Sequence, residues 1–120
     1  MQVSPVSFGY TTRLSEMYKK GKIPLEKGLY GGELTKENKT NEHIRPVSKG
    51  GKTTLNNIAL ATAENNQKRG NDPLLEHLTM ENLIEYTLAF LEMPKTKGFN
   101  PQDYIKGFLK NVLQTIREGY

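Results

Sequence analysis

Apolar residues recur with helical spacing through the last fifty residues of this 120-residue chain. Thr79 predicts the start of a helix over residues 80–91. Its apolar side is formed by Leu83, Ile84, Leu88 and Leu91. Asn100, followed by Pro101, predicts the start of a second helix over residues 101–116. Its apolar stripe has the 3.6-residue period of a helix and comprises Tyr104, Ile105, Phe108, Leu109, Val112, Leu113 and Ile116. We expect a helical hairpin that packs on the chain's own core, with a dimerisation face as the alternative.

The front of the chain predicts one short helix. Residues 1–10 contain a proline and a glycine and read as an extended lead-in. Residues 11–20 place Leu14, Met17 and Tyr18 on one helical face, and Gly21 ends the predicted helix.

The middle third follows a different pattern. Proline and glycine residues between 46 and 51 exclude a helix there, and short β-like segments flank them at 41–45 and 57–61. Thr62 then predicts the start of a helix over 63–69, which Gly70 ends. The order strand, strand, helix within about thirty residues predicts an α+β fold.

Charge and composition narrow the possible functions. Residues 36–70 carry seven Lys and Arg against three Glu, whereas residues 71–120 carry five against seven acidic residues. A basic front joined to an acidic helical back favours an anionic partner for the front. The chain contains no cysteine, which excludes a disulfide scaffold and a cysteine nucleophile. No apolar run approaches the ~20 residues of a membrane span, and no signal-peptide pattern opens the chain, so we expect no membrane contact and a cytoplasmic, intracellular location.

An ordered set of polar residues and glycines lies between Tyr30 and Asn71. It comprises Glu42-His43-Ile44-Arg45-Pro46, Ser48-Lys49-Gly50-Gly51, Asn57-Ile58 and Asn66-Gln67-Lys68-Arg69-Gly70. In this order and at these separations the segment resembles the HNH endonuclease family, whose fold is a β-hairpin followed by a helix around one metal ion. The chain length fits a single domain over 1–120. Within this domain the resemblance implies an HNH ββα-metal core at 28–71, which a flanking N-terminal helix and a C-terminal helical extension at 72–120 complete.

The resemblance also implies a role for four side chains. His43 is the general base that takes a proton from water. Glu42 and Asn66 hold one divalent ion, Mg²⁺ or Mn²⁺, through oxygen atoms. Asn57 is a brace whose amide bonds the loop and keeps His43 in position. Adjacent strand residues normally point to opposite faces, so Glu42 and His43 share one site only if the strand bends or ends there.

Two doubled asparagines leave the register of the motif open. Asn56-Asn57 and Asn65-Asn66 allow two pairings, each with a separation of nine residues. We take Asn57 and Asn66, because Asn57 directly precedes the apolar strand at Ile58 and Asn66 keeps the order Asn-x-x-basic-Gly.

The absence of cysteine separates this chain from many members of the family. Those members brace the fold with two cysteine pairs around zinc, and here Leu29-Tyr30-Gly31-Gly32 stands where the first pair would be. We therefore expect no structural zinc and a brace of apolar packing from the terminal helices.

Five basic residues of the motif are candidate phosphate contacts: Arg45, Lys49, Lys52, Lys68 and Arg69. We expect Tyr30 to pack in the core and His77 to be an ordinary surface or core histidine. The sequence thus predicts a metal-dependent DNA endonuclease, with a phage or other mobile element as one origin to consider and a homodimer through the C-terminal helices as a further expectation. The alternative is a nucleic-acid-binding module that keeps the HNH fold without cutting.

Overall fold

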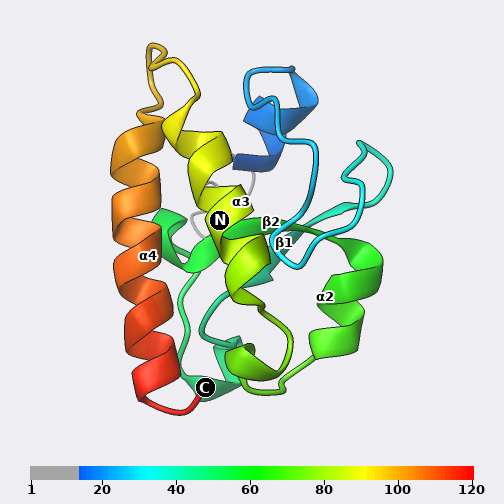
Figure 1. Ribbon diagram of the computed structural model, residues 1–120, viewed down its shortest axis with the longest axis vertical. Coiled ribbons are helices and arrows are strands. Elements are labelled where there is room, and N and C mark those ends of the chain that lie inside the picture. The colour runs from blue at the N-terminus through cyan, green and yellow to red at the C-terminus, as the bar shows by residue number, and fades with distance from the viewer. Residues whose placement is uncertain (1–13) are drawn as a thin grey trace, which may run out of the picture.

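The computed structural model describes residues 14–120, which are built around a two-stranded antiparallel sheet. The regular elements are β1 (Lys39–His43), β2 (Ile58–Thr62), α2 (Ala63–Arg69), α3 (Met80–Leu91) and α4 (Pro101–Arg117). Lys39 lies opposite Thr62 and His43 lies opposite Ile58 at the two ends of the strand pair. The hairpin lies between α2 on one side and α4 on the other, with α3 beside α4 (Figure 1). This mixture of helices and a small sheet agrees with the predicted α+β class.

The helices begin where the sequence predicts. The side chains of Thr62, Thr79 and Asn100 each accept a hydrogen bond from the main-chain nitrogen three residues later, at 3.1–3.2 Å. These bonds satisfy main-chain donors that a helix leaves free in its first turn. Residues 14–19 are also helical. The predicted lead-in over 1–10 and the first residues of the predicted N-terminal helix lie outside the described residues.

Both strands are shifted from their predicted bounds. β1 ends at His43, two residues earlier than expected, because side-chain bonding replaces strand pairing beyond that point. The main-chain nitrogen of Ile44 still bonds the main-chain oxygen of Asn57 at 2.9 Å. The next nitrogen, that of Arg45, instead bonds the side-chain oxygen of Asn57 at 2.9 Å. The strand pair therefore ends at the residues expected to form the site.

The outer edge of β2 is closed by other parts of the chain. The Tyr104 hydroxyl donates to the main-chain oxygen of Ile58 at 2.7 Å, and the Leu60 nitrogen donates to the Tyr86 hydroxyl at 3.1 Å. The two hydroxyls lie 2.9 Å apart and bond each other. Burial raises the pKa of both phenols, so both stay protonated. α3 and α4 thus satisfy main-chain groups that an unpaired strand edge would leave open.

An aromatic cluster fills the space between the sheet and the helical hairpin. Its rings have centroid separations of 4.9–6.5 Å, and they belong to Tyr86, Phe90, Phe99, Tyr104 and Phe108. These distances are typical of aromatic rings that attract each other beyond simple apolar contact. Because this packing joins the C-terminal helices to the hairpin, it serves as a brace in a chain without cysteine.

The predicted apolar faces are only partly correct. On α4 the buried residues include Ile105 and Val112, but Leu113 is 59% exposed. On α3 the buried residues are Tyr86 and Phe90. Of the predicted stripe, Leu83 packs partly buried against the core, whereas Ile84, Leu88 and Leu91 are about half exposed. The prediction is wrong for these three residues because the aromatic rings, which bury more surface, occupy the inward face.

The buried side of α4 lies in the chain's own core, and the predicted homodimer through the C-terminal helices receives no support. Within residues 14–120, no helix has the length and apolar character needed to cross a membrane.

We expect Tyr104→Phe to lower the free energy of unfolding by about 1–2 kcal/mol in urea titrations. The substitution keeps the ring in the cluster but leaves the buried oxygen of Ile58 without its donor. Tyr120→Phe is the matched control, since the Tyr120 hydroxyl makes no hydrogen bond within the described residues. Equal stability of the two variants would contradict a bracing role for the Tyr104 hydroxyl.

Candidate functional site

His43 lies at the end of β1 and is half-buried. Its Nε2 lies 2.9 Å from the hydroxyl oxygen of Thr53, and its main-chain oxygen accepts a bond from Nη1 of Arg69 at 3.1 Å. Burial lowers the pKa of the imidazole below its ordinary value, so the ring is neutral at pH 7. With the ring proton on Nε2, Thr53 accepts it, and Nδ1 keeps a lone pair that can take a proton.

Glu42 is buried, with 5% of its surface exposed. Its Oε2 accepts a 2.5 Å hydrogen bond from the Tyr30 hydroxyl and lies 3.2 Å from Nη1 of Arg69. Burial raises the pKa of the carboxyl group, and the bonds from Tyr30 and Arg69 oppose that rise. Tyr30 therefore packs in the core, as expected, and the Glu42 carboxylate already has a cationic partner.

Arg69 is 1% exposed and joins four segments of the chain. Besides Glu42, its Nη1 contacts the Tyr30 hydroxyl at 3.3 Å and the His43 main-chain oxygen at 3.1 Å. Its Nε donates to the main-chain oxygen of Asp72 at 3.0 Å, and its Nη2 to that of Tyr120 at 3.1 Å. A phosphate contact by Arg69, which the sequence led us to expect, does not fit this buried guanidinium, each nitrogen of which already bonds a protein oxygen.

Asn57 is buried and ties the two ends of the loop between the strands together. Its Nδ2 donates to the main-chain oxygens of Arg45 at 3.2 Å and Lys52 at 2.8 Å. Its Oδ1 accepts from the main-chain nitrogen of Arg45 at 2.9 Å and from Nδ2 of Asn111, on α4, at 2.7 Å. Asn56, in the other register, is exposed and bonds Thr54 instead. The loop that follows His43 is therefore fixed at both ends by one amide.

The Gly-Gly turn has a steric reason. Gly50 has a positive φ of 87°, which favours glycine, and a Cβ on Gly51 would overlap the main-chain oxygen of Arg45. Glycine at both positions lets the loop fold back against its own beginning.

Asn66 lies on α2 and faces β1. Its Nδ2 donates to the Thr40 hydroxyl at 3.0 Å and to the main-chain oxygen of Asn41 at 3.4 Å. Thr40 and Glu42 alternate with Asn41 and His43 along β1, so Asn66 and Glu42 lie on the α2 side of the strand, opposite the direction that regular alternation gives His43. β1 ends at His43, which is the strand end that a site shared by Glu42 and His43 requires. The alternative residue, Asn65, bonds the main-chain oxygen of Gly31 at 3.1 Å instead.

The other four basic candidates lie near the surface. Arg45 forms an ion pair with Glu118, donates to the Lys49 main-chain oxygen at 2.9 Å, and stacks 4.7 Å above the Tyr120 ring. Lys49 is exposed, 5.9 Å from the centre of the same ring. Lys52 and Lys68 are also exposed. In residues 14–120 these three lysines make no ion pair and are open to an anion.

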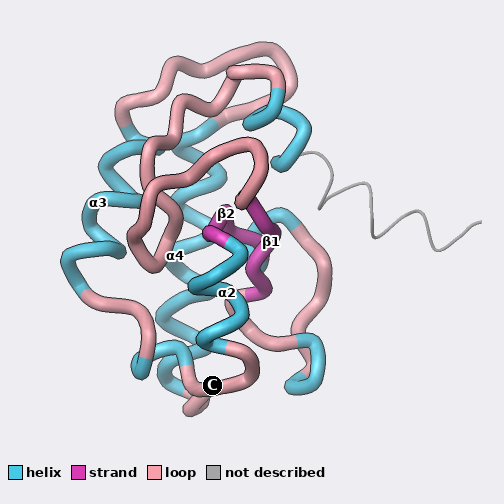
Figure 2. Tube along the Cα trace, turned by 90° about the vertical axis from the view of Figure 1, so that its right-hand side faces the viewer, coloured by secondary structure: helices cyan, strands magenta, loops and turns pink. Residues whose placement is uncertain are grey.

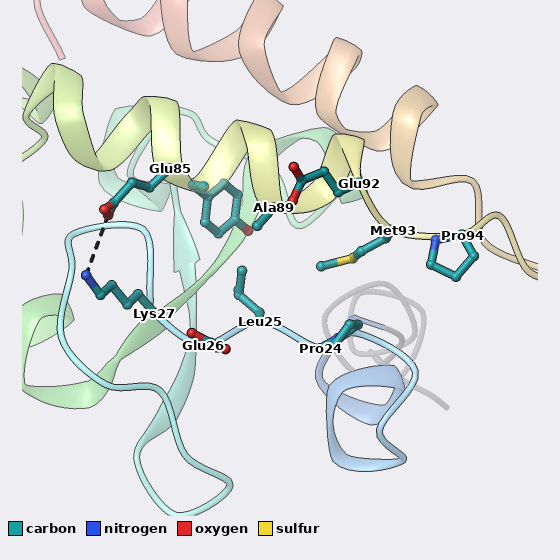
Figure 3. Close-up of a pocket in the computed structure, with 10 residues that line it drawn as sticks. Pro24, Leu25, Glu26, Lys27, Glu85, Ala89, Glu92, Met93 and Pro94 are labelled. Atoms are coloured by element: carbon teal, nitrogen blue, oxygen red, sulfur yellow. Dashed lines mark ion pairs between the residues drawn. The ribbon is translucent and has the colours of Figure 1, made fainter.

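A cavity of about 450 Å³ lies between residues 24–27 and α3, and none of the candidate site residues lines it (Figure 3). Its lining includes three glutamates, Glu26, Glu85 and Glu92, and one cation, Lys27, which pairs with Glu85 at 3.7 Å. Within residues 14–120 the other two glutamates form no ion pair. A cavity with this charge repels phosphate, so it does not extend the candidate site.

A second group of potential metal ligands follows α2. Asp72, Glu76 and His77 place one ligand atom each within 4.8 Å of one another. His77 is bonded to Asp72 at 2.8 Å, and both carboxylates are exposed. His77 is thus a surface histidine, as expected, and it is hydrogen-bonded to a neighbouring carboxylate.

Two contacts of the site were missed by sequence reasoning. Thr53 holds the His43 ring, and Asn111 holds Asn57 from the C-terminal helix. Thr53 lies in a loop without periodicity, and Asn111 lies 54 residues beyond its partner, so neither carried a local signal.

Figure 2 shows the molecule from the side on which α2 lies in Figure 1, with α2 next to the two strands. The HNH endonuclease family model matches residues 29–72, the segment that contains β1, β2 and α2. No match was found among curated proteins, and none among solved structures.

Proposed function

We propose that this protein is a metal-dependent endonuclease that hydrolyses phosphodiester bonds in DNA, because the HNH endonuclease family model matches residues 29–72. The family indicates nuclease-type function, and the substrate, the metal and the residue roles are our proposal. The observation that carries it is the placement of His43 within the matched segment, at the end of β1, with its ring against Thr53 and its main-chain oxygen bonded by Arg69.

The role proposed for His43 is that of the general base. Nδ1 takes a proton from a water molecule, whose oxygen attacks phosphorus as the bond to the 3′-oxygen breaks. Asn57 supports this role by fixing the loop that follows His43. A base held in place from several sides loses little freedom when the substrate binds.

The proposed metal ligands fit a hard divalent ion in chemical type. Glu42 offers a carboxylate and Asn66 a carboxamide oxygen, and both lie on the α2 side of β1. A cationic group already rests against that carboxylate, in the form of the Arg69 guanidinium. When bound, Mg²⁺ or Mn²⁺ supplies positive charge for the developing charge on phosphate and for the leaving oxygen.

The exposed lysines at positions 49, 52 and 68 are the proposed phosphate contacts, together with Arg45 once it leaves Glu118. Such contacts position a nucleic acid without reading its sequence. Arg69 is not included, because it is buried.

The test is incubation of the purified protein with supercoiled plasmid in MgCl₂ or in EDTA. We expect nicked plasmid in MgCl₂ and none in EDTA, measured on agarose gels. Binding without cutting, on several forms of DNA and RNA, would contradict the proposal and favour the non-catalytic nucleic-acid-binding module. Cutting in EDTA would contradict the role of the metal.

A further inference from the structure

Three oxygen atoms of different chemical kinds converge on Nη1 of Arg69. They are Oε2 of Glu42 at 3.2 Å, the Tyr30 hydroxyl oxygen at 3.3 Å and the His43 main-chain oxygen at 3.1 Å. Glu42 is the only buried carboxylate in the part of the chain that the structure describes. A positive group therefore occupies an oxygen-lined position against the one buried negative charge.

Resting on the proposed function, in which Glu42 is a metal ligand, we infer that Arg69 is a tethered cation that competes with the divalent ion for the Glu42 carboxylate. A buried carboxylate needs a cation beside it, because an unpaired buried charge is strongly destabilising. Two cations on the same carboxylate repel each other in a medium of low dielectric constant. Metal binding therefore weakens the contact of Nη1 with Glu42, and Arg69 raises the metal concentration at which the site fills.

The other contacts of Arg69 allow this exchange. Nε and Nη2 bond the main-chain oxygens of Asp72 and Tyr120 and hold the planar guanidinium beside the site independently of Glu42, so the contact of Nη1 with Glu42 can lengthen while Arg69 stays in place. Tyr30 bonds Glu42 directly at 2.5 Å and keeps the carboxylate in place when that contact lengthens. Asn66 lies one helical turn before Arg69 on α2 and faces the same strand.

The test measures Mn²⁺ binding by isothermal titration calorimetry. The parent protein for this test carries His77→Ala, which removes one potential ligand of the group formed with Asp72 and Glu76. Arg69→Met, Glu42→Gln and the double variant are made in this parent. We expect Arg69→Met to bind Mn²⁺ at least tenfold more tightly than the parent, a change of about 1.4 kcal/mol. In the Glu42→Gln background, Arg69→Met is expected to leave the Mn²⁺ affinity unchanged. A folded Arg69→Met protein that binds Mn²⁺ no more tightly than the parent overturns the inference.

Thermal unfolding gives a second readout. In EDTA, Arg69→Met is expected to melt below the parent, because Glu42 has lost its partner, and MnCl₂ is expected to raise its Tm by more than it raises the parent's. An equal or smaller rise overturns the inference.

Should Arg69→Met not fold without metal, ¹⁵N NMR of the Arg69 guanidinium in the unaltered protein gives the answer. Added Mg²⁺ is expected to shift the Nη signals, and unchanged signals at saturating Mg²⁺ overturn the inference.

The binding measurements separate this inference from the proposed function. Competition at Glu42 in a protein that cuts no nucleic acid would contradict the nuclease and leave the inference standing. Metal-dependent cutting by a protein whose Mn²⁺ affinity does not change when Arg69 or Glu42 is replaced would support the nuclease and overturn the inference.

Discussion

His43→Ala is expected to lower the rate of plasmid nicking in MgCl₂ by about 10²–10⁴-fold. The alanine removes the group proposed to take the proton from water and leaves the other proposed site residues in place. The imidazole makes one side-chain hydrogen bond, to Thr53, and is half-buried, so the fold is expected to persist. The measurement is the first-order rate constant for loss of supercoiled plasmid, with circular dichroism as the check on folding.

The chain supplies a matched control, because it contains only two histidines. His77→Ala removes the histidine of the exposed group after α2 and is expected to leave the nicking rate within a factor of about three, which is under 1 kcal/mol. The nicking rate of Thr53→Val is expected to lie between those of the two histidine variants, since this substitution removes the hydrogen bond to the His43 ring but keeps the ring itself. A His43→Ala protein that cuts as fast as the parent would rule out His43 as the base.

The short-range features of the fold could be predicted from the sequence. Capping residues and breakers act on the nearest few residues, so Thr62, Thr79 and Asn100 marked helix starts correctly. The inward face of α3 could not be predicted, because it depends on the aromatic partners that α4 brings to Tyr86 and Phe90. Spacing alone made Ile84 and Leu88 look equally suited to the core.

The candidate site shows the same division. Its residue types lie in one short segment, and their order was visible along the chain. The sequence did not show which charged side chains are buried and paired. Arg69 looks like a surface cation until the fold brings Glu42, on β1, to within 3.2 Å of it. The contact from Asn111 on α4 to Asn57 was equally invisible, because long-range contacts leave no periodic pattern.

The buried Asn57 amide has the second largest expected effect of any single change. Asn57→Ala removes all four of its side-chain hydrogen bonds, three of them to main-chain groups of Arg45 and Lys52. Each buried group left without a partner costs about 1–3 kcal/mol, and water entering the loop recovers part of this. We expect a loss of about 3 kcal/mol in the free energy of unfolding, measured in urea.

Asn57→Asp is the matched variant for the same position. It keeps an acceptor for the Arg45 nitrogen and for Asn111, but it cannot donate to the main-chain oxygens of Arg45 and Lys52. The added charge is buried beside these oxygens, so the aspartate is expected to be no more stable than the alanine. An aspartate variant as stable as the parent would mean that the two donated bonds contribute little to holding the loop.

Activity separates a brace from a purely structural residue. Asn57→Ala, assayed at a temperature where it is folded, is expected to lose nicking rate by at least tenfold, because the loop after His43 is no longer fixed relative to β1. Its affinity for DNA is expected to change by less than about threefold, since the exposed lysines remain. A folded Asn57→Ala protein with full nicking rate would show that His43 keeps its position without the amide, leaving Thr53 and Arg69 as its supports.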